Sequence, residues 1–106
     1  MTEAERTIFN KALVEYGISS QKMMAIEECA ELINALAKLP RGRASQADII
    51  TELADVSIMV DQLAVFFGEK AFIEERNRKI RRLEERLEER LRVCKLYDQR
   101  GLNNGL

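Results

Sequence analysis

The sequence predicts an all-α protein, a four-helix bundle-like protomer with a long, charged C-terminal helix. Two observations favour this class. Only 1 proline and 5 glycines occur in 106 residues, which are too few turn residues for a many-stranded β fold. Hydrophobic residues make up 46% of the chain, which is enough for a packed core. We expect one domain over residues 1–100 and a frayed tail over residues 101–106.

Helix boundaries follow from capping residues and glycines. The capping-box signature Thr2-x-x-Glu5 starts the first helix, and Gly17 ends it. Ser19 or Ser20 is predicted to cap the second helix, because serine side chains accept hydrogen bonds from a free helix N-terminus. The predicted helices cover residues 2–16, 19–39, 45–67 and 69–97.

Pro40 forbids simple continuation of the second helix, so a short loop follows it. The signature Ser45-x-x-Asp48 opens the third helix, and Gly68 separates the third helix from the fourth. Short links of this kind place consecutive helices antiparallel.

Composition and charge exclude several classes of protein. Histidine is absent, which excludes a Ser-His-Asp triad and imidazole-ligated zinc. The net charge is -1, so no basic field exists to hold nucleic acid. The first residues are acidic, unlike a signal peptide, and no apolar run approaches the roughly 20 residues of a membrane span. We expect a cytoplasmic protein with Cys29 and Cys94 as free thiols. No nucleic acid or membrane is expected as a partner, and the small size favours a homo-oligomer.

Two carboxylates interrupt the apolar sector of the third helix. Glu52 and Asp55 are three residues apart, so both point the same way. Like charges on a buried face are costly unless a cation neutralises them. The apolar sector itself comprises Val56, Met59, Val60, Leu63, Phe66 and Phe67.

The second helix shows the same irregularity. Glu27, Glu28 and Glu31 cluster on a helix that is otherwise apolar nearly all round. Such a helix is usually buried on more than one side. Its main apolar face comprises Ile26, Cys29, Ala30, Ile33, Leu36 and Ala37.

Antiparallel packing of these two helices brings their acids to the same level, because each group lies about 10 residues from the connecting loop. Oxygen ligands without histidine or cysteine select Mg²⁺, or Mn²⁺ as a substitute, over zinc. A di-iron carboxylate centre is excluded, since such bundles need histidine. The alternative is that the acids are solvated or pair with arginine and lysine.

The acids and their neighbours resemble a known family. Glu27-Glu28-x-x-Glu31, followed 21 residues later by Glu52-x-x-Asp55, is similar to the EExxE…ExxD signature of the MazG-like all-α nucleoside triphosphate pyrophosphohydrolases. The resemblance covers roughly residues 21–91. It implies a magnesium-dependent hydrolase that converts a nucleoside triphosphate to the monophosphate and pyrophosphate, working as a dimer or a dimer of dimers.

The resemblance also implies roles for particular residues. Those that match the metal-binding acids are Glu28, Glu31, Glu52 and Asp55. Glu27 matches an additional acid that holds a second metal or orients the attacking water, and Glu27 and Glu28 are the expected catalytic acids. The candidate phosphate-binding residues are Asn77, Lys79 and Arg82 in the fourth helix, with Lys38 a weaker candidate.

Base recognition is the least determined part of the predicted site. Phe9 and Gln21 are our candidates for contacts to the base or sugar. The signature is shared with phosphoribosyl-ATP pyrophosphohydrolases, which form an alternative assignment. A third alternative is a non-catalytic helical interaction module, because Ile73, Ile80 and Leu87 form a coiled-coil-like seam in the fourth helix.

Overall fold

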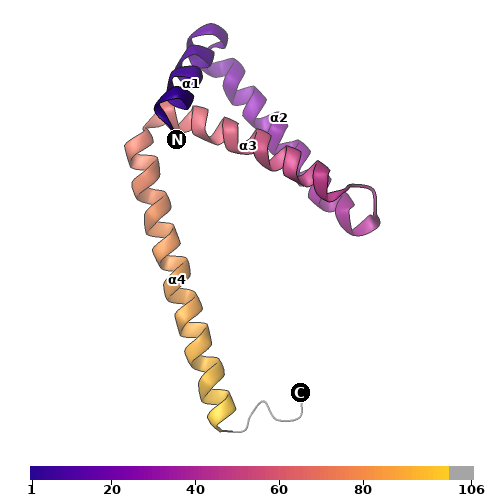
Figure 1. Cartoon of the computed structure of the whole chain (residues 1–106), viewed down its shortest axis with the longest axis vertical. Helices are drawn as coiled ribbons and strands as arrows, with labels where there is room; N and C mark the ends of the chain where they lie inside the picture. The colour runs from indigo at the N-terminus through magenta and orange to yellow at the C-terminus, as the bar shows by residue number, and fades with distance from the viewer. Residues whose placement is uncertain (101–106) are drawn as a thin grey trace. The chain divides into compact units, whose positions relative to one another are not determined.

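The computed structural model of the chain describes residues 1–100, which form helices joined by short connections and no strand (Figure 1). The all-α prediction is therefore confirmed for this part of the chain. The expected frayed tail at residues 101–106 lies outside the described residues. No helix in residues 1–100 is long and apolar enough to cross a membrane. The helices are α1 (Glu3–Tyr16), α2 (Ile18–Lys38), the short 3-10 helix η1 (Leu39–Arg41), α3 (Gln46–Phe67) and α4 (Glu69–Gln99).

Helices α1 and α3 begin at the capping boxes that the sequence predicts. The Thr2 hydroxyl accepts a hydrogen bond from the backbone N–H of Glu5 at 3.1 Å, and the Glu5 carboxylate accepts one from the N–H of Thr2 at 3.3 Å. The same reciprocal pair joins Ser45 and Asp48 at 3.1 and 2.8 Å. Each box satisfies two backbone donors that the first helical turn leaves free.

The start of α2 differs from the prediction, because neither Ser19 nor Ser20 caps it. Gly17 is the N-cap residue, and no side chain caps this end. Gly17 has φ 81°, a conformation that favours glycine, and it turns the chain within one residue. Its N–H donates to the carbonyl of Leu13 at 3.0 Å, while its carbonyl accepts from the N–H of Gln21 at 3.1 Å. One residue thus ends α1 and opens α2, which leaves no separate position for a serine cap.

The chain divides into two units, residues 1–69 and 70–106, and each is described by itself. In the first unit α2 and α3 lie side by side, joined at one end by η1 and the following loop (Figure 1). Helix α1 packs against both. The second unit contains α4 from Lys70 onward. The all-α class and its four α-helices are observed, and the packing of all four into one bundle stays a prediction.

The core of the first unit is small and contains two amides. Its buried apolar residues come from all three helices, and they are Phe9, Ala25, Met59 and Ala64. Gln21 and Gln62 are buried with them, at 5% and 8% exposure. No large side chain among the described residues is completely buried.

An ion pair in the first unit joins α1 to the residue that follows α3 and Gly68. The Arg6 guanidinium of α1 donates to both carboxylate oxygens of Glu69, from Nε at 2.8 Å and from a terminal nitrogen at 2.7 Å. Arg6 also donates to Glu3 at 2.6 Å. The bidentate contact raises the pKa of Arg6 and lowers the pKa of Glu69, because each charge stabilises the other.

The predicted main apolar face of α2 does not face the core. Ile26 and Ile33 are 61% and 68% exposed, and Cys29 is exposed as well. The opposite side of α2 packs inward, where its buried or half-buried residues are Ile18, Gln21, Ala25, Glu28, Leu32 and Ala35. This part of the prediction was wrong because α3 takes the side of α2 that carries the carboxylates.

The apolar sector of α3 is only partly buried. Met59 is buried, and Val56 and Leu63 are half-buried. Phe66 and Phe67 are 50% and 69% exposed, although their rings contact each other edge to face with centroids 5.0 Å apart. Both α2 and α3 therefore carry apolar side chains that the first unit does not bury.

Replacing Ser45 by alanine should lower the free energy of unfolding by about 1 kcal/mol, because the variant loses the side-chain cap of α3. Ser19→Ala is the matched control, since Ser19 lies in the first turn of α2 without capping it. Urea denaturation followed by circular dichroism measures both. Equal losses for the two variants would contradict the assigned caps.

Candidate functional site

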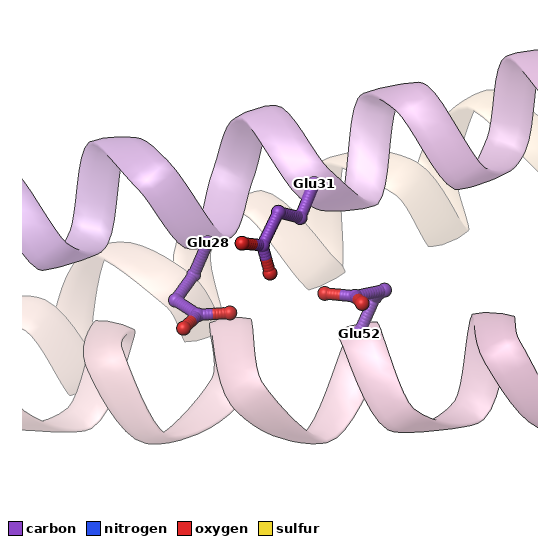
Figure 2. A group of neighbouring side chains, drawn as sticks. All are labelled: Glu28, Glu31 and Glu52. Carbon is purple, nitrogen blue, oxygen red and sulfur yellow. The ribbon is translucent and has the colours of Figure 1, made fainter.

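Three carboxylates meet where α2 packs on α3. Glu28 and Glu31 lie three residues apart on α2, and Glu52 points toward them from α3 (Figure 2). One oxygen of each lies within 4.8 Å of the others. We call these three residues the acid cluster. The antiparallel helices bring the two acidic segments to the same level, as their distances from the loop predicted.

The acid cluster is partly withdrawn from water. Glu28 and Glu52 are half-buried, whereas Glu31 is exposed. The Oε2 atoms of Glu28 and Glu52 are buried and have no hydrogen-bond partner among the described residues. Because an unpaired buried carboxylate oxygen is costly, this arrangement favours a bound cation or a proton.

Burial and like charge act together on two members of the cluster. Burial raises the pKa of Glu28, and the negative charges of Glu31 and Asp55 raise it further. The pKa of Glu52 is raised by the same causes in the same order. In both residues, loss of the proton places a negative charge in a half-buried position where other carboxylates already lie close. A bound divalent cation would instead favour the deprotonated, charged carboxylates.

Asp55 and Glu27 occupy different positions relative to the acid cluster. Asp55 is half-buried on α3, and its charge acts on both Glu28 and Glu52. It is not one of the three residues whose oxygens meet. Glu27 is exposed on α2. The structure therefore places Asp55 at the edge of the cluster and Glu27 outside it.

The candidates for nucleotide contacts are spread over the chain. Phe9 and Gln21 are buried, at 7% and 5% exposure, and both lie in the core. Lys38 is exposed and is the last residue of α2. The three candidates in α4 are exposed and belong to the second unit, and they are Asn77, Lys79 and Arg82. The roles of all six residues stay predictions.

Sequence reasoning missed one residue near this face of α3. Gln62 is buried, and its Oε1 has no hydrogen-bond partner among the described residues. It follows Glu52 and Asp55 by ten and seven residues, so all three fall on one face of the helix. That spacing was available in the sequence, but only the structure shows that the amide oxygen is unpaired.

The donor set of the acid cluster suits a hard divalent cation. All donors are carboxylate oxygens, which Mg²⁺ and Mn²⁺ prefer. Glu28, Glu31 and Glu52 each offer one carboxylate oxygen as a ligand atom.

Comparisons with protein-family models, curated proteins and solved structures find no match to this chain.

Metal-free Glu52→Gln protein should melt at a higher temperature than the wild type at pH 7. The folded state raises the pKa of Glu52 above its ordinary value of 4.5, so the folded protein binds this proton more tightly than the unfolded chain. The stabilising contribution is therefore complete below pH 4.5 and is lost as pH rises through the raised value. Glutamine removes this loss, so the difference between variant and wild type should shrink on acidification.

The measurement is thermal denaturation in EDTA across this pH range, with Glu27→Gln as the exposed control on α2. Superimposable profiles for wild type and Glu52→Gln would show that the charges of the acid cluster do not repel in the folded protein.

Proposed function

We propose that this protein is a magnesium-dependent hydrolase that converts a nucleoside triphosphate to the monophosphate and pyrophosphate. The observation that carries the proposal is the acid cluster, in which three carboxylate oxygens lie within 4.8 Å of one another. Two of its members have buried oxygens without hydrogen-bond partners. The resemblance of the sequence to the MazG-like signature supports the same assignment, since three of the five acids that match it, Glu28, Glu31 and Glu52, meet in the cluster.

Glu28, Glu31 and Glu52 are the residues that would hold the metal, with Asp55 at the edge of the group. A bound Mg²⁺ supplies Lewis-acid polarisation of a phosphoryl group and a lower pKa for bound water. A triphosphate carries several negative charges into a site that is itself acidic. Without a multivalent cation, that approach is repulsive.

Proton acceptance falls to the carboxylates of α2. We assign this role to Glu28, which lies within the cluster, and to Glu27, which the sequence resemblance indicates as a catalytic acid. A carboxylate within the cluster can take the proton of a nearby water. Glu27 is exposed beside it, at a position open to water.

The remaining contacts to substrate are proposed from residue chemistry. Basic and amide groups at Lys38, Asn77, Lys79 and Arg82 would bind phosphate oxygens. Gln21 and Phe9 would contact the base or sugar. The amide oxygen of Gln62 is buried and unpaired, and it is a further candidate to accept a hydrogen bond from the substrate.

Assembly into a dimer or a dimer of dimers is part of the proposal. The outer face of α2 leaves Ile26 and Ile33 mostly exposed, and Phe66 and Phe67 of α3 are exposed as well. Soluble monomers rarely leave a large apolar patch in water. A second protomer would cover such surface.

We propose that the protein works in the cytoplasm, where the exposed thiols of Cys29 and Cys94 stay reduced.

A non-catalytic interaction module is the alternative that a structural observation favours, because the apolar seam of α4 is exposed. A phosphoribosyl-ATP pyrophosphohydrolase would use the same acids, and the two enzymes differ only in substrate. Thermal melts with Mg²⁺ and an assay of the reaction product distinguish either enzyme from the interaction module. The product assay also distinguishes the two enzymes, because they act on different substrates.

Magnesium should stabilise the protein. At concentrations well above the dissociation constant, we expect the melting temperature to rise by about 5–10 °C, because the cation binds only the folded cluster. Asp55→Asn should lessen the rise, since it removes a charge that acts on Glu28 and Glu52. Thermal melts of EDTA-treated protein with Mg²⁺ or Mn²⁺ measure the effect. Identical melts with and without either ion would favour the interaction module.

Pyrophosphate should be the product when the protein is incubated with Mg²⁺ and a panel of ribo-, deoxy- and modified nucleoside triphosphates. Phosphoribosyl-ATP belongs in the panel. Glu52→Gln removes a proposed ligand with little change in volume, so turnover should fall about 100-fold to 1,000-fold. The matched control is Glu15→Gln, an exposed acid on α1 outside the cluster. Release of orthophosphate as the first product would contradict the assignment.

A further inference from the structure

Helix α4 carries an apolar stripe that its own unit does not cover. Successive members are spaced by three, four, four and three residues, so they fall on one side of the helix. All are exposed, with Ile80 at 46% and Leu91 at 61%. We call this stripe the α4 seam. It comprises Ile80, Leu83, Leu87, Leu91 and Cys94.

Opposite charges are already paired on the far side of α4. Arg78 binds the Glu75 carboxylate, with one contact from Nε at 3.0 Å, and Arg92 binds Glu89. At 100° per residue these four side chains lie about 120–180° from the centre of the seam. The far side therefore has the mixed, internally paired charges typical of a surface in water.

The charges that border the seam are arranged differently. Glu84 and Glu88 lie on one side of it, about 60° and 100° from its centre. Arg86 and Arg90 lie at the same angles on the other side. We call these pairs the acidic flank and the basic flank. Each flank carries charges of one sign directly beside the apolar seam, so a helix that covers the seam also meets these charges. The charges of the far side lie away from any such contact.

The flanks indicate what that partner is. Two helices that pair through one seam in parallel orientation bring opposite flanks together, because the symmetry axis runs along the helices. In an antiparallel pair the axis is perpendicular to the helices, so each flank meets its own copy. For this chain, parallel pairing sets acid against base on both sides, and antiparallel pairing sets acid against acid and base against base.

We propose that two copies of this chain pair their α4 helices in parallel and in register through the α4 seam over residues 80–94. The acidic flank of each helix faces the basic flank of the other. Apolar burial along the seam supplies attraction, and the flanks fix the orientation. This pairing does not depend on the proposed hydrolase activity, because no residue of the acid cluster takes part.

Cys94 provides a direct test, because it is a free, exposed thiol within the seam. In register, it lies opposite the same residue of the other copy. With Cys29→Ser, Cys94 is the one thiol of the chain. Mild oxidation of this full-length variant should give a disulfide-linked dimer. Ile80→Cys, in a chain with both natural cysteines replaced by serine, should also cross-link to itself. Glu85→Cys in the same background is the control, since residue 85 faces away from the seam.

Cross-linking at both seam positions and not at residue 85 is the expected result. Absence of a dimer through Cys94 would overturn the proposal, whatever else covers the seam. A product that joins position 80 of one variant to Cys94 of the other would overturn it in favour of antiparallel pairing, because only that orientation brings the two ends together.

Charge reversal tests the flanks separately. In the Cys29→Ser chain, Glu84→Lys with Glu88→Lys should slow cross-linking through Cys94 about tenfold or more, because attraction becomes repulsion on both sides. Glu85→Lys with Glu89→Lys is the matched control on the far side and should have little effect. Mixing the first variant with an Arg86→Glu, Arg90→Glu chain should restore cross-linking between unlike chains. Equal rates for all variants would refute the role of the flanks.

Discussion

The packing of α2 against α3 is the constraint on which the first unit depends. This contact contributes to the core through Ala25 and Met59, and it also holds Glu28 and Glu52, which lie nearer the connecting loop. The helices cannot approach each other without bringing these carboxylates together. The same contact therefore gains free energy from apolar burial and loses part of it to the repulsion of like charges. Any ligand that neutralises the acid cluster strengthens the contact that forms the unit.

This arrangement differs from the charges elsewhere in the chain. Arg6 and Glu69 pair directly within the first unit, and Glu75 and Arg78 do so along α4. Opposite charges are thus available and are used where only stability is at stake. None of the ion pairs among residues 1–100 involves a carboxylate of the acid cluster. The unpaired carboxylates of the acid cluster are the feature on which the proposed cation site rests.

Exposed apolar surface is the second consequence of how the helices pack. Because α3 occupies the carboxylate-bearing side of α2, the more apolar side of α2 is left outward, with Ile33 68% exposed. In α4 the seam is outward as well. The two surfaces lie in different units and differ in chemistry: the first is apolar, and the second is bordered by segregated charges. Apolar burial drives association but gives little orientation, whereas charged flanks specify which way a partner runs. The outer side of α2 thus offers a partner apolar area alone, whereas α4 offers apolar area bordered by charges of one sign on each side.

The sequence by itself determined the helices and included, among its five candidate acids, the three that meet. Capping boxes at Thr2 and Ser45 and stops at Gly17 and Gly68 are local interactions, so residue types a few positions apart suffice to locate them. The level at which Glu28, Glu31 and Glu52 meet also followed from the sequence, because helical rise is regular and the connecting loop is short. Only the tertiary structure decided which side of α2 faces inward. A helix apolar nearly all round has several sides that could be buried, and the choice depends on what packs against it. The contact between Arg6 and Glu69, 63 residues apart, was hidden from the sequence for the same reason. No local pattern encodes a pair that meets only after the chain has folded.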